Sequence, residues 1–378
     1  MGALEGGRGG RGAAGKVATF DPTSGAPHDR QKRPASGTSL WQVEHRMDAV
    51  ILVEPSRRQP TRRAWHNVWP AHMNEQPVIH VAAVRKTYGR TVAVDEISFD
   101  VQPGEIFGLI GPNGAGKTTT MECVDGLRIP DRGLISVLGL DPRRDVYALQ
   151  ERIGVQLQEA QLQKRIKVRE AVGLWASLYR KPVDGDRLIE QLGLGDKKNA
   201  WFMTLSGGQK QRLFIALALI NDPELVFLDE LTTGLDPQAR RTIWDLVRGI
   251  RQRGKTVFLT THLMEEAERL CDRVAIIDHG RIIDIGTPAE LVRRHCPERT
   301  VIIVSEDPTA AERFRMIPQV QSVSSAGSQL TIRGQSGDLV TRVIECLAEH
   351  RIQVIDFRTE LPTLEDVFLK LTGHMIRD

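Results

Sequence analysis

One short stretch constrains the fold of this chain more than any other feature. Residues 111–118 read GPNGAGKT, directly after an apolar run at residues 106–110. The spacing predicts a buried strand that turns tightly into a helix opening at Lys117. Glycines allow backbone N–H groups to turn inward without Cβ clashes, and the start of a helix adds positive partial charge. The stretch therefore predicts a cradle for phosphate groups.

The side chains of this stretch match the needs of a nucleoside triphosphate bound with magnesium. The Lys117 ammonium would reach the β- and γ-phosphates, the Thr118 hydroxyl would hold Mg²⁺, and Thr119 would support the α-phosphate. The residues predicted to contact the nucleotide are Gly111, Pro112, Asn113, Gly114, Ala115, Gly116, Lys117, Thr118 and Thr119. The alternative, a glycine-rich turn without a ligand, is disfavoured by the adjacent Lys and Thr.

A second segment, residues 225–230, reads LVFLDE and predicts a buried strand that ends in two carboxylates. Asp229 would lie at the carboxyl end of this strand, beside the cradle, and hold Mg²⁺ through water. Glu230 would face the γ-phosphate and polarise an attacking water as a general base. An apolar run before two acidic residues is common at strand ends, so this assignment depends on the cradle upstream.

A third motif lies between these two segments. Residues 205–209 read LSGGQ before an apolar helix pattern, and in this position the motif resembles the signature of ATP-binding-cassette (ABC) ATPases. The resemblance covers residues 77–299 and implies further nucleotide contacts from Tyr88, Ser206, Gly207, Gly208, Gln209, Asp229 and Asp236. Tyr88 matches the aromatic residue that stacks on adenine, Asp236 belongs to the D-loop, and His262 matches the switch histidine.

The Q-loop of the family is matched by one of two glutamines. Residues 155–159 read VQLQE, and Gln158 is preferred because the family usually has an acidic residue directly after the glutamine; Gln156 is the alternative. The resemblance implies four catalytic residues: Glu230, His262, Gln158 and Lys117. It implies three Mg²⁺ ligands: Thr118, Gln158 and Asp229. Leu231 departs from the proline that the family commonly has there, which affects only the stiffness of the following turn.

Some of these features also have ordinary structural interpretations. Tyr88 can be an exposed loop aromatic, and His262 can be a strand-end histidine without a catalytic role. The basic run at residues 164–169 is typical of a solvated helix face.

Residues 77–299 predict an α/β fold, because apolar runs alternate with helical patterns. The strand candidates are residues 105–111, 224–229, 256–261 and 273–278. Such runs suit strands that are buried on both faces of a mainly parallel sheet. The resemblance adds an antiparallel β subdomain and a helical subdomain, which together make up the ABC cassette of the P-loop NTPase fold.

Residues 300–378 predict a second, small α+β domain. Its expected strands are residues 301–305, 320–324, 329–333 and 353–357, and its expected helices are residues 309–316, 337–350 and 364–371. Thr363, with Asp366 three residues later, predicts an N-cap for the last helix. Residues 361–373, LPTLEDVFLKLTG, resemble the tail of ATPase subunits of the ABC-2 exporter type, a group that includes drug and antibiotic resistance exporters.

Residues 1–72 are rich in Gly, Pro, Ser and Arg without a sustained period, which predicts a disordered N-terminal extension. Met73 is an alternative start, because 39 Arg against 12 Lys indicate a GC-rich genome, in which open reading frames overrun their true starts. Residues 1–72 carry a net charge of +5 and residues 73–378 a net charge of −2. The overall charge of +3 is therefore no evidence for nucleic-acid binding, which we do not expect.

The resemblance implies an ATP-hydrolysing motor of a transporter. A single cassette does not complete its site, so two copies would associate head to tail and enclose two MgATP. The longest apolar run, residues 213–220, is far shorter than the roughly 20 residues of a membrane-spanning helix. We therefore expect a separate membrane permease, with this chain peripheral on the cytoplasmic face of the inner membrane. Residues 159–179 would help to form the groove that receives the permease.

Three functional classes stay open on the sequence alone. An ABC-2 type exporter is favoured by the tail motif, and an importer ATPase with a regulatory tail is the nearest alternative. The third class is a non-transport ABC ATPase that acts on nucleic acid or ribosomes. Residues 117–204 leave room for no long coiled coil, which disfavours chromosome-structure and DNA-repair proteins. The transported substrate is not indicated by any motif.

Overall fold

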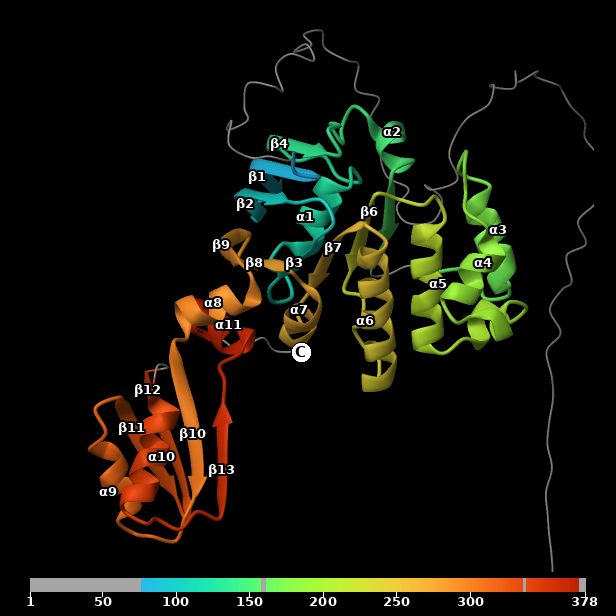
Figure 1. The fold of residues 1–378 in the computed structure, drawn as a ribbon. Coiled ribbons are helices and arrows are strands. Elements are labelled where there is room, and N and C mark those ends of the chain that lie inside the picture. Colours follow the sequence, from blue (N-terminus) through green and yellow to red (C-terminus); the bar gives the residue numbers. More distant parts are fainter. Residues whose placement is uncertain (1–75, 158–160, 336–337, 374–378) are drawn as a thin grey trace, which may run out of the picture. The chain divides into compact units, whose positions relative to one another are not determined.

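The computed structural model, shown in Figure 1, describes residues 76–157, 161–335 and 338–373. The predictions for residues 1–72 and for Gln158 lie outside these described residues. The described strands form three sheets, of six, three and four strands. We call residues 76–297 the larger unit and residues 298–360 the smaller unit.

The six-stranded sheet has the order β5-β6-β7-β3-β8-β9. Its strands are β3 (Ile106–Ile110), β5 (Ile153–Gln156), β6 (Leu225–Asp229), β7 (Thr256–Thr261), β8 (Arg273–Asp278) and β9 (Arg281–Gly286). All neighbours run parallel except β8 and β9, which form an antiparallel pair. The mainly parallel sheet that the apolar runs predict is confirmed, and β3, β6 and β7 end at the same edge.

The helices of the larger unit follow these strands in the chain. They are α1 (Lys117–Val124), α2 (Val146–Gln150), α3 (Val168–Ala176), α4 (Gly185–Gln191), α5 (Gly207–Leu219), α6 (Pro237–Gln252), α7 (Met264–Leu270) and α8 (Pro288–His295). Two short 3₁₀ turns, Gly195–Lys197 and Phe202–Thr204, lie between α4 and α5. None of the described helices is long and apolar enough to cross a membrane.

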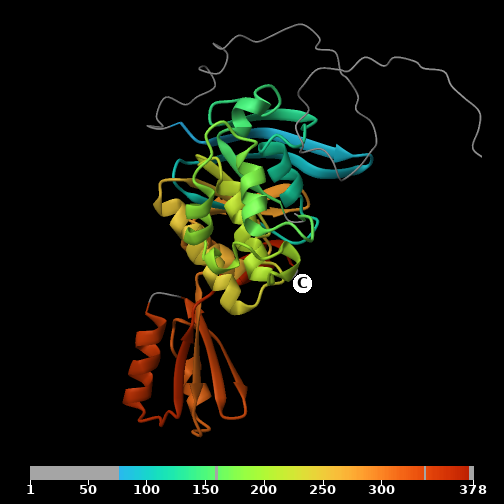
Figure 2. The same cartoon turned by 90° about the vertical axis from the view of Figure 1, so that its right-hand side faces the viewer.

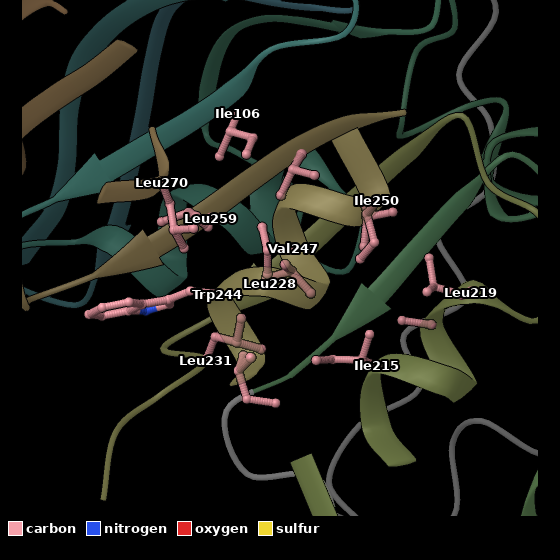
Figure 3. Close-up of a cluster of buried hydrophobic side chains, with 14 of the residues drawn as sticks. Ile106, Ile215, Leu219, Leu228, Leu231, Trp244, Val247, Ile250, Leu259 and Leu270 are labelled. Carbon is pink, nitrogen blue, oxygen red and sulfur yellow. The ribbon is translucent and has the colours of Figure 1, made fainter. Parts of the chain in front are cut away.

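The central strands β3, β6 and β7 are buried at every position, so both faces of this part of the sheet are covered, since successive side chains point to opposite sides. On β6, Val226 and Leu228 belong to a cluster with α5, α6 and α7, part of which Figure 3 shows. Phe227, between them, packs on the other face against Phe258, with the ring centroids 5.7 Å apart. Burial on both faces explains why these strands read as continuous apolar runs.

A three-stranded antiparallel sheet has the order β2-β1-β4. Its buried side chains belong to the same hydrophobic cluster as Phe227 and Phe258. Its strands are β1 (Ile79–Tyr88), β2 (Thr91–Val101) and β4 (Arg132–Val137). Phe99 of β2 stacks on Phe107 of β3 at 5.5 Å between ring centroids, and Met121 of α1 lies in the same cluster. Helix α1 thus contacts both sheets, which holds the loop that precedes it.

The smaller unit is a four-stranded antiparallel sheet, in the order β11-β12-β10-β13, with two helices (Figure 2). Its elements are β10 (Glu298–Val304), α9 (Ala310–Arg315), β11 (Val320–Ala326), β12 (Gln329–Gln335), α10 (Leu339–Glu349) and β13 (Asp356–Glu360). Phe314 of α9 and Val343 of α10 are buried in one cluster with Val301 and Ile332 of the sheet. This is the α+β pattern that the sequence predicts.

The last strand of the smaller unit departs from the prediction of residues 353–357. β13 begins at Asp356, and its ladder pairs Asp356 with Val304 and Glu360 with Thr300. Ile355 is apolar, but its side chain is 66% exposed. Its N–H donates to the Val304 carbonyl just before the strand begins. An edge strand with an exposed face can be built from polar residues. The prediction placed the strand too early because it followed the apolar residues before Asp356.

The last helix, α11 (Leu364–Thr372), packs in the core of the larger unit. As predicted, Thr363 caps it, and the Asp366 carboxylate accepts the Thr363 N–H at 2.8 Å. Three side chains of α11 are buried in the cluster that contains α7 and α8: Leu364, Val367 and Phe368. The Leu364 N–H also donates to Glu268 Oε1 of α7 at 2.5 Å. The chain therefore returns from the smaller unit to close the core of the larger one.

We predict that Phe368→Ala lowers the free energy of unfolding by about 3–5 kcal/mol, because it removes a fully buried ring between helices. Urea denaturation followed by far-ultraviolet circular dichroism measures the change. Leu369→Ala, on the exposed side of the same helix, is the matched control and should change the free energy by less than about 0.5 kcal/mol. Equal effects of the two variants would contradict the docking of α11.

Candidate functional site

The cradle, residues 111–118, connects the end of β3 to the start of α1. Gly116 is the N-cap residue of α1 at a φ of 103°, and a Cβ there would lie 2.2 Å from the Ala93 carbonyl oxygen. A Cβ at Gly111 would lie 2.1 Å from the Ile277 carbonyl oxygen. Only glycine fits at both positions, which leaves the backbone N–H groups open to close approach.

The start of α1 carries positive potential that no side chain of its own first turn offsets. Gly116 makes no side-chain cap, and the first turn contains no acidic residue. The buried Lys117 ammonium donates to the carbonyls of Gly111 at 3.0 Å and Pro112 at 3.1 Å. Burial lowers the pKa of Lys117. An anion of the phosphate type fits this place, because it supplies acceptors to the helix N–H groups and a counter-charge to the ammonium.

The ends of parallel strands bring the two predicted carboxylates to the cradle. Asp229 is the last residue of β6, and Glu230 follows it directly. The Thr118 hydroxyl of α1 lies 3.5 Å from Asp229 Oδ1. A hydroxyl and a carboxylate oxygen at this separation are the donor types that Mg²⁺ prefers. The structure thus places Thr118 and Asp229 together; Gln158 lies outside the described residues.

Glu230 is the point where the strand ends and the cradle meet. Lys117 Nζ and His262 Nδ1 each lie 3.3 Å from the same oxygen, Glu230 Oε1, and all three side chains are less than a tenth exposed. Glu230 also has a φ of 45°, an uncommon conformation for this residue type that the surrounding contacts maintain.

Neighbouring carboxylates in this site have opposite pKa shifts. The hydrogen bond from His262, together with the charge of Lys117, lowers the pKa of Glu230 to about 2. Burial raises the pKa of Asp229. An anionic ligand that attracted Lys117 away from Glu230 would remove one cause of the low pKa and make this carboxylate a stronger base. The site can therefore hold a triphosphate and activate a water beside it.

Thr260 joins the two carboxylate residues and was not singled out by the sequence. Its hydroxyl, buried at the end of β7, donates to Asp229 Oδ1. The Glu230 N–H donates in turn to Thr260 Oγ1 at 3.2 Å and to the Thr260 carbonyl at 3.1 Å. The only sequence signal is a threonine two residues before His262, which is too common to mark a site.

Two other predicted residues serve first as helix caps. Ser206 is the N-cap of α5, where its hydroxyl accepts the Gln209 N–H at 3.3 Å and the Gln209 side chain accepts the Ser206 N–H at 2.9 Å. Asp236 caps α6 through the N–H groups of Gln238 and Ala239. Ser206 and Gly207 are exposed, so the start of α5 is open to a second molecule.

The remaining predicted residues are less constrained by their surroundings. Tyr88, at the end of β1, is 42% exposed, and its ring centroid lies 5.2 Å from the Arg128 guanidinium carbon. Lys86 Nζ also lies 5.7 Å from this ring centroid. Gln156, the alternative to Gln158, is buried at the end of β5 and donates to the Leu157 carbonyl at 2.8 Å.

Family models match two parts of the chain. Residues 94–233 match the model described as "ABC transporter". Residues 286–372 match the model described as "ATP-binding protein DrrA1-3-like, C-terminal domain". The first match contains the cradle, the LSGGQ turn and both carboxylates, and the second contains the smaller unit and α11.

Curated relatives match over most of their own length. A "Nod factor export ATP-binding protein I" of Ralstonia nicotianae is 39% identical over 310 residues, which cover 80% of this chain and 96% of that protein. A protein of the same name from Paraburkholderia xenovorans is 40% identical over 310 residues, covering 80% of this chain and 99% of its own.

Solved structures have the same fold. One titled as an ATP-binding subunit of an ABC transporter has a TM-score of 0.53 and 27% identity, and covers 57% of this chain and 92% of its own. Another, part of an ABC transporter complex from Clostridium perfringens, has a TM-score of 0.53 and 28% identity, and covers 59% of this chain and 97% of its own.

We predict that Thr260→Val moves the acid limb of the ATPase pH profile upward. The variant removes a hydrogen bond that lowers the pKa of Asp229, so this carboxyl group would take up its proton at a higher pH. Steady-state ATPase rates between pH 5 and 8 measure the shift. Thr260→Ser keeps the hydroxyl and is the control. An unshifted profile in Thr260→Val would show that this bond does not tune Asp229.

Proposed function

The chain belongs to the ABC transporter family and is an ATPase, and we propose that it is the motor subunit of an ABC-2 type exporter that drives a separate membrane permease. The observation that carries the proposal is a cassette site followed by a DrrA1-3-like C-terminal match at residues 286–372. Relatives that carry the name of a Nod factor export ATP-binding protein span nearly the same length as the matched part of this chain.

MgATP is the proposed substrate of the site. Backbone N–H groups within residues 113–119 and the Lys117 ammonium would hold the phosphates, and Tyr88 would stack on the adenine. Thr118 and Asp229 would hold Mg²⁺ together with Gln158, and the bound ion would offset negative charge on the phosphate oxygens. The fit is supported by the glycine positions that leave backbone N–H groups open and by the 3.5 Å approach of Thr118 to Asp229.

Glu230 is the proposed general base. When the γ-phosphate takes the ammonium of Lys117, Glu230 loses a charge partner and gains basicity, so it can accept the proton of an attacking water. His262, which contacts the same carboxylate oxygen, would hold Glu230 in place and face the terminal phosphate. Glu230 therefore becomes the stronger base only when ATP is bound.

Completion of the site requires a second copy of the chain. The exposed turn at Ser206 and Gly207 begins α5, a helix of 13 residues. Its free N-terminal N–H groups are suited to the γ-phosphate bound in the cradle of a partner. We propose a head-to-tail homodimer in which ATP joins the two copies and hydrolysis releases them.

The permease would contact the helical part of the larger unit, on the cytoplasmic face of the inner membrane. Leu174 of α3 and Trp201 are each 46% exposed, and Met203 is 52% exposed. These apolar side chains are our proposed contacts with the permease. The direction of transport, out of the cell, is supported by the DrrA1-3-like match and by the names of the relatives; an importer ATPase is the alternative.

We predict that Glu230→Gln still binds ATP but hydrolyses it about 10²- to 10⁴-fold more slowly, because it removes the base. Stopped-flow nucleotide binding and single-turnover hydrolysis separate the two steps. Lys117→Ala is the contrasting variant and should weaken ATP binding itself. Near-normal turnover in Glu230→Gln would refute Glu230 as the base while leaving the family assignment intact.

We also predict that the tagged chain captures a polytopic permease from detergent-solubilised membranes of its own host. Leu174→Asp should reduce this capture at least about tenfold, because it puts a charge into the apolar contact. Ile344→Asp, on an equally exposed apolar position of α10, is the control and should not. Capture of ribosomes or DNA instead, with an affinity that falls steeply with salt, would favour a non-transport ATPase.

A further inference from the structure

Glu266 of α7 is a buried carboxylate that none of the steps above uses. Its side chain is 1% exposed. One oxygen, Oε1, accepts two hydrogen bonds: from the Thr232 hydroxyl at 2.8 Å and from the Trp244 indole N–H at 3.0 Å. The second oxygen, Oε2, is buried without a hydrogen-bond partner among the residues that the structure describes. Among the described residues, no lysine, arginine or histidine forms an ion pair with Glu266.

Such a residue is a poor device for stability alone. A buried carboxyl group with an unpartnered oxygen carries a desolvation penalty, and an apolar residue of similar volume would pack there more favourably. The surroundings are apolar enough for that: Trp244 belongs to the buried cluster that also contains Leu231 and Leu270 (Figure 3). The two hydrogen bonds therefore matter for what they hold in place.

The first bond holds the turn that carries the proposed base. Thr232 is fully buried and lies two residues after Glu230. The other bonds within the turn are local: the Thr233 N–H lies 3.4 Å from the Glu230 carbonyl, the Leu235 N–H lies 3.2 Å from the Thr232 carbonyl, and the Thr233 hydroxyl lies 3.5 Å from Glu230 Oε2. Glu230 itself has positive φ, a conformation that persists only where neighbouring contacts fix it.

The second link runs through the helix. His262 lies two residues before α7, and Glu266 lies on the first turns of that helix. These contacts form a closed loop. Glu230 contacts His262, and the backbone connects His262 to Glu266 of α7. Glu266 in turn accepts a hydrogen bond from Thr232, which lies two residues after Glu230. Trp244 adds α6, the helix that Asp236 caps.

We propose that Glu266 is a positioning residue for ATP hydrolysis: by binding Thr232 and Trp244 together, it fixes the distance between Glu230 and His262 and links both to α6. This role rests on the proposed function of Glu230 as the base. In this role Glu266 itself touches neither nucleotide nor the attacking water. It acts on kcat through the geometry of the pair, and ATP binding by the cradle is independent of it.

The test compares Glu266→Leu with Glu266→Gln. The leucine variant removes the acceptor and should lower kcat about 10- to 100-fold, the usual effect of a small misplacement at a reacting centre, while the KM for ATP changes less than about threefold. The glutamine variant keeps the shape and one acceptor oxygen, so it should retain kcat within about threefold. Thr232→Val removes one donor and serves if the leucine variant does not fold; it should lower kcat in the same direction.

Controls separate this role from stability and from the base itself. Leu270→Ala destabilises the same helix without touching the two hydrogen bonds, and its kcat per folded molecule should stay near that of the parent chain. Glu230→Gln, measured in parallel, tests the proposed base: if it keeps turnover, the base assignment fails. If it loses turnover while Glu266→Leu and Thr232→Val keep theirs, only the positioning role is overturned. Equal losses of kcat in Glu266→Leu and Leu270→Ala also overturn it.

Discussion

Parallel pairing of β3, β6 and β7 is the constraint on which the rest of the site depends. Hydrogen bonding in register brings the ends of the three strands to one edge of the sheet, although they are far apart in the sequence. The cradle follows β3, the two carboxylates lie at the end of β6, and His262 follows β7. Burial of both faces then prevents any one strand from sliding, because a shift by one residue would exchange the buried sets of side chains.

The chemistry of the site follows from how differently two adjacent residues are solvated. Asp229 is the last residue of a buried strand, and burial raises its pKa although the hydroxyl groups of Thr260 and Thr118 act in the opposite direction. Glu230, one step beyond the strand, turns toward two nitrogen donors and is held strongly as an anion. A positive φ at Glu230 produces this change of direction within a single residue. Local backbone conformation therefore separates the proposed metal-binding role of Asp229 from the proposed base role of Glu230.

Motifs predicted the features that a few consecutive residues encode: the cradle, the strand ends and the capped start of α11. Thr260 and Glu266 were missed because their hydrogen-bond partners lie 31 and 34 positions away, where one sequence shows no pattern. The predicted start of β13 was wrong because apolar residues were interpreted as buried strand residues. The family and the fold are confirmed by the matches, whereas the role of each site residue stays a prediction.

The return of α11 to the larger unit changes what the smaller unit is. It leaves the larger unit after α8 and rejoins it at α11, and these two helices contact each other. The smaller unit is therefore an insertion with two neighbouring anchor points rather than a tail with one. A tail can swing or be cut away without disturbing its host, whereas an insertion transmits strain through both anchors. A nick within the smaller unit would leave the core of the larger unit dependent on a detached helix, because α11 packs against α7 and α8.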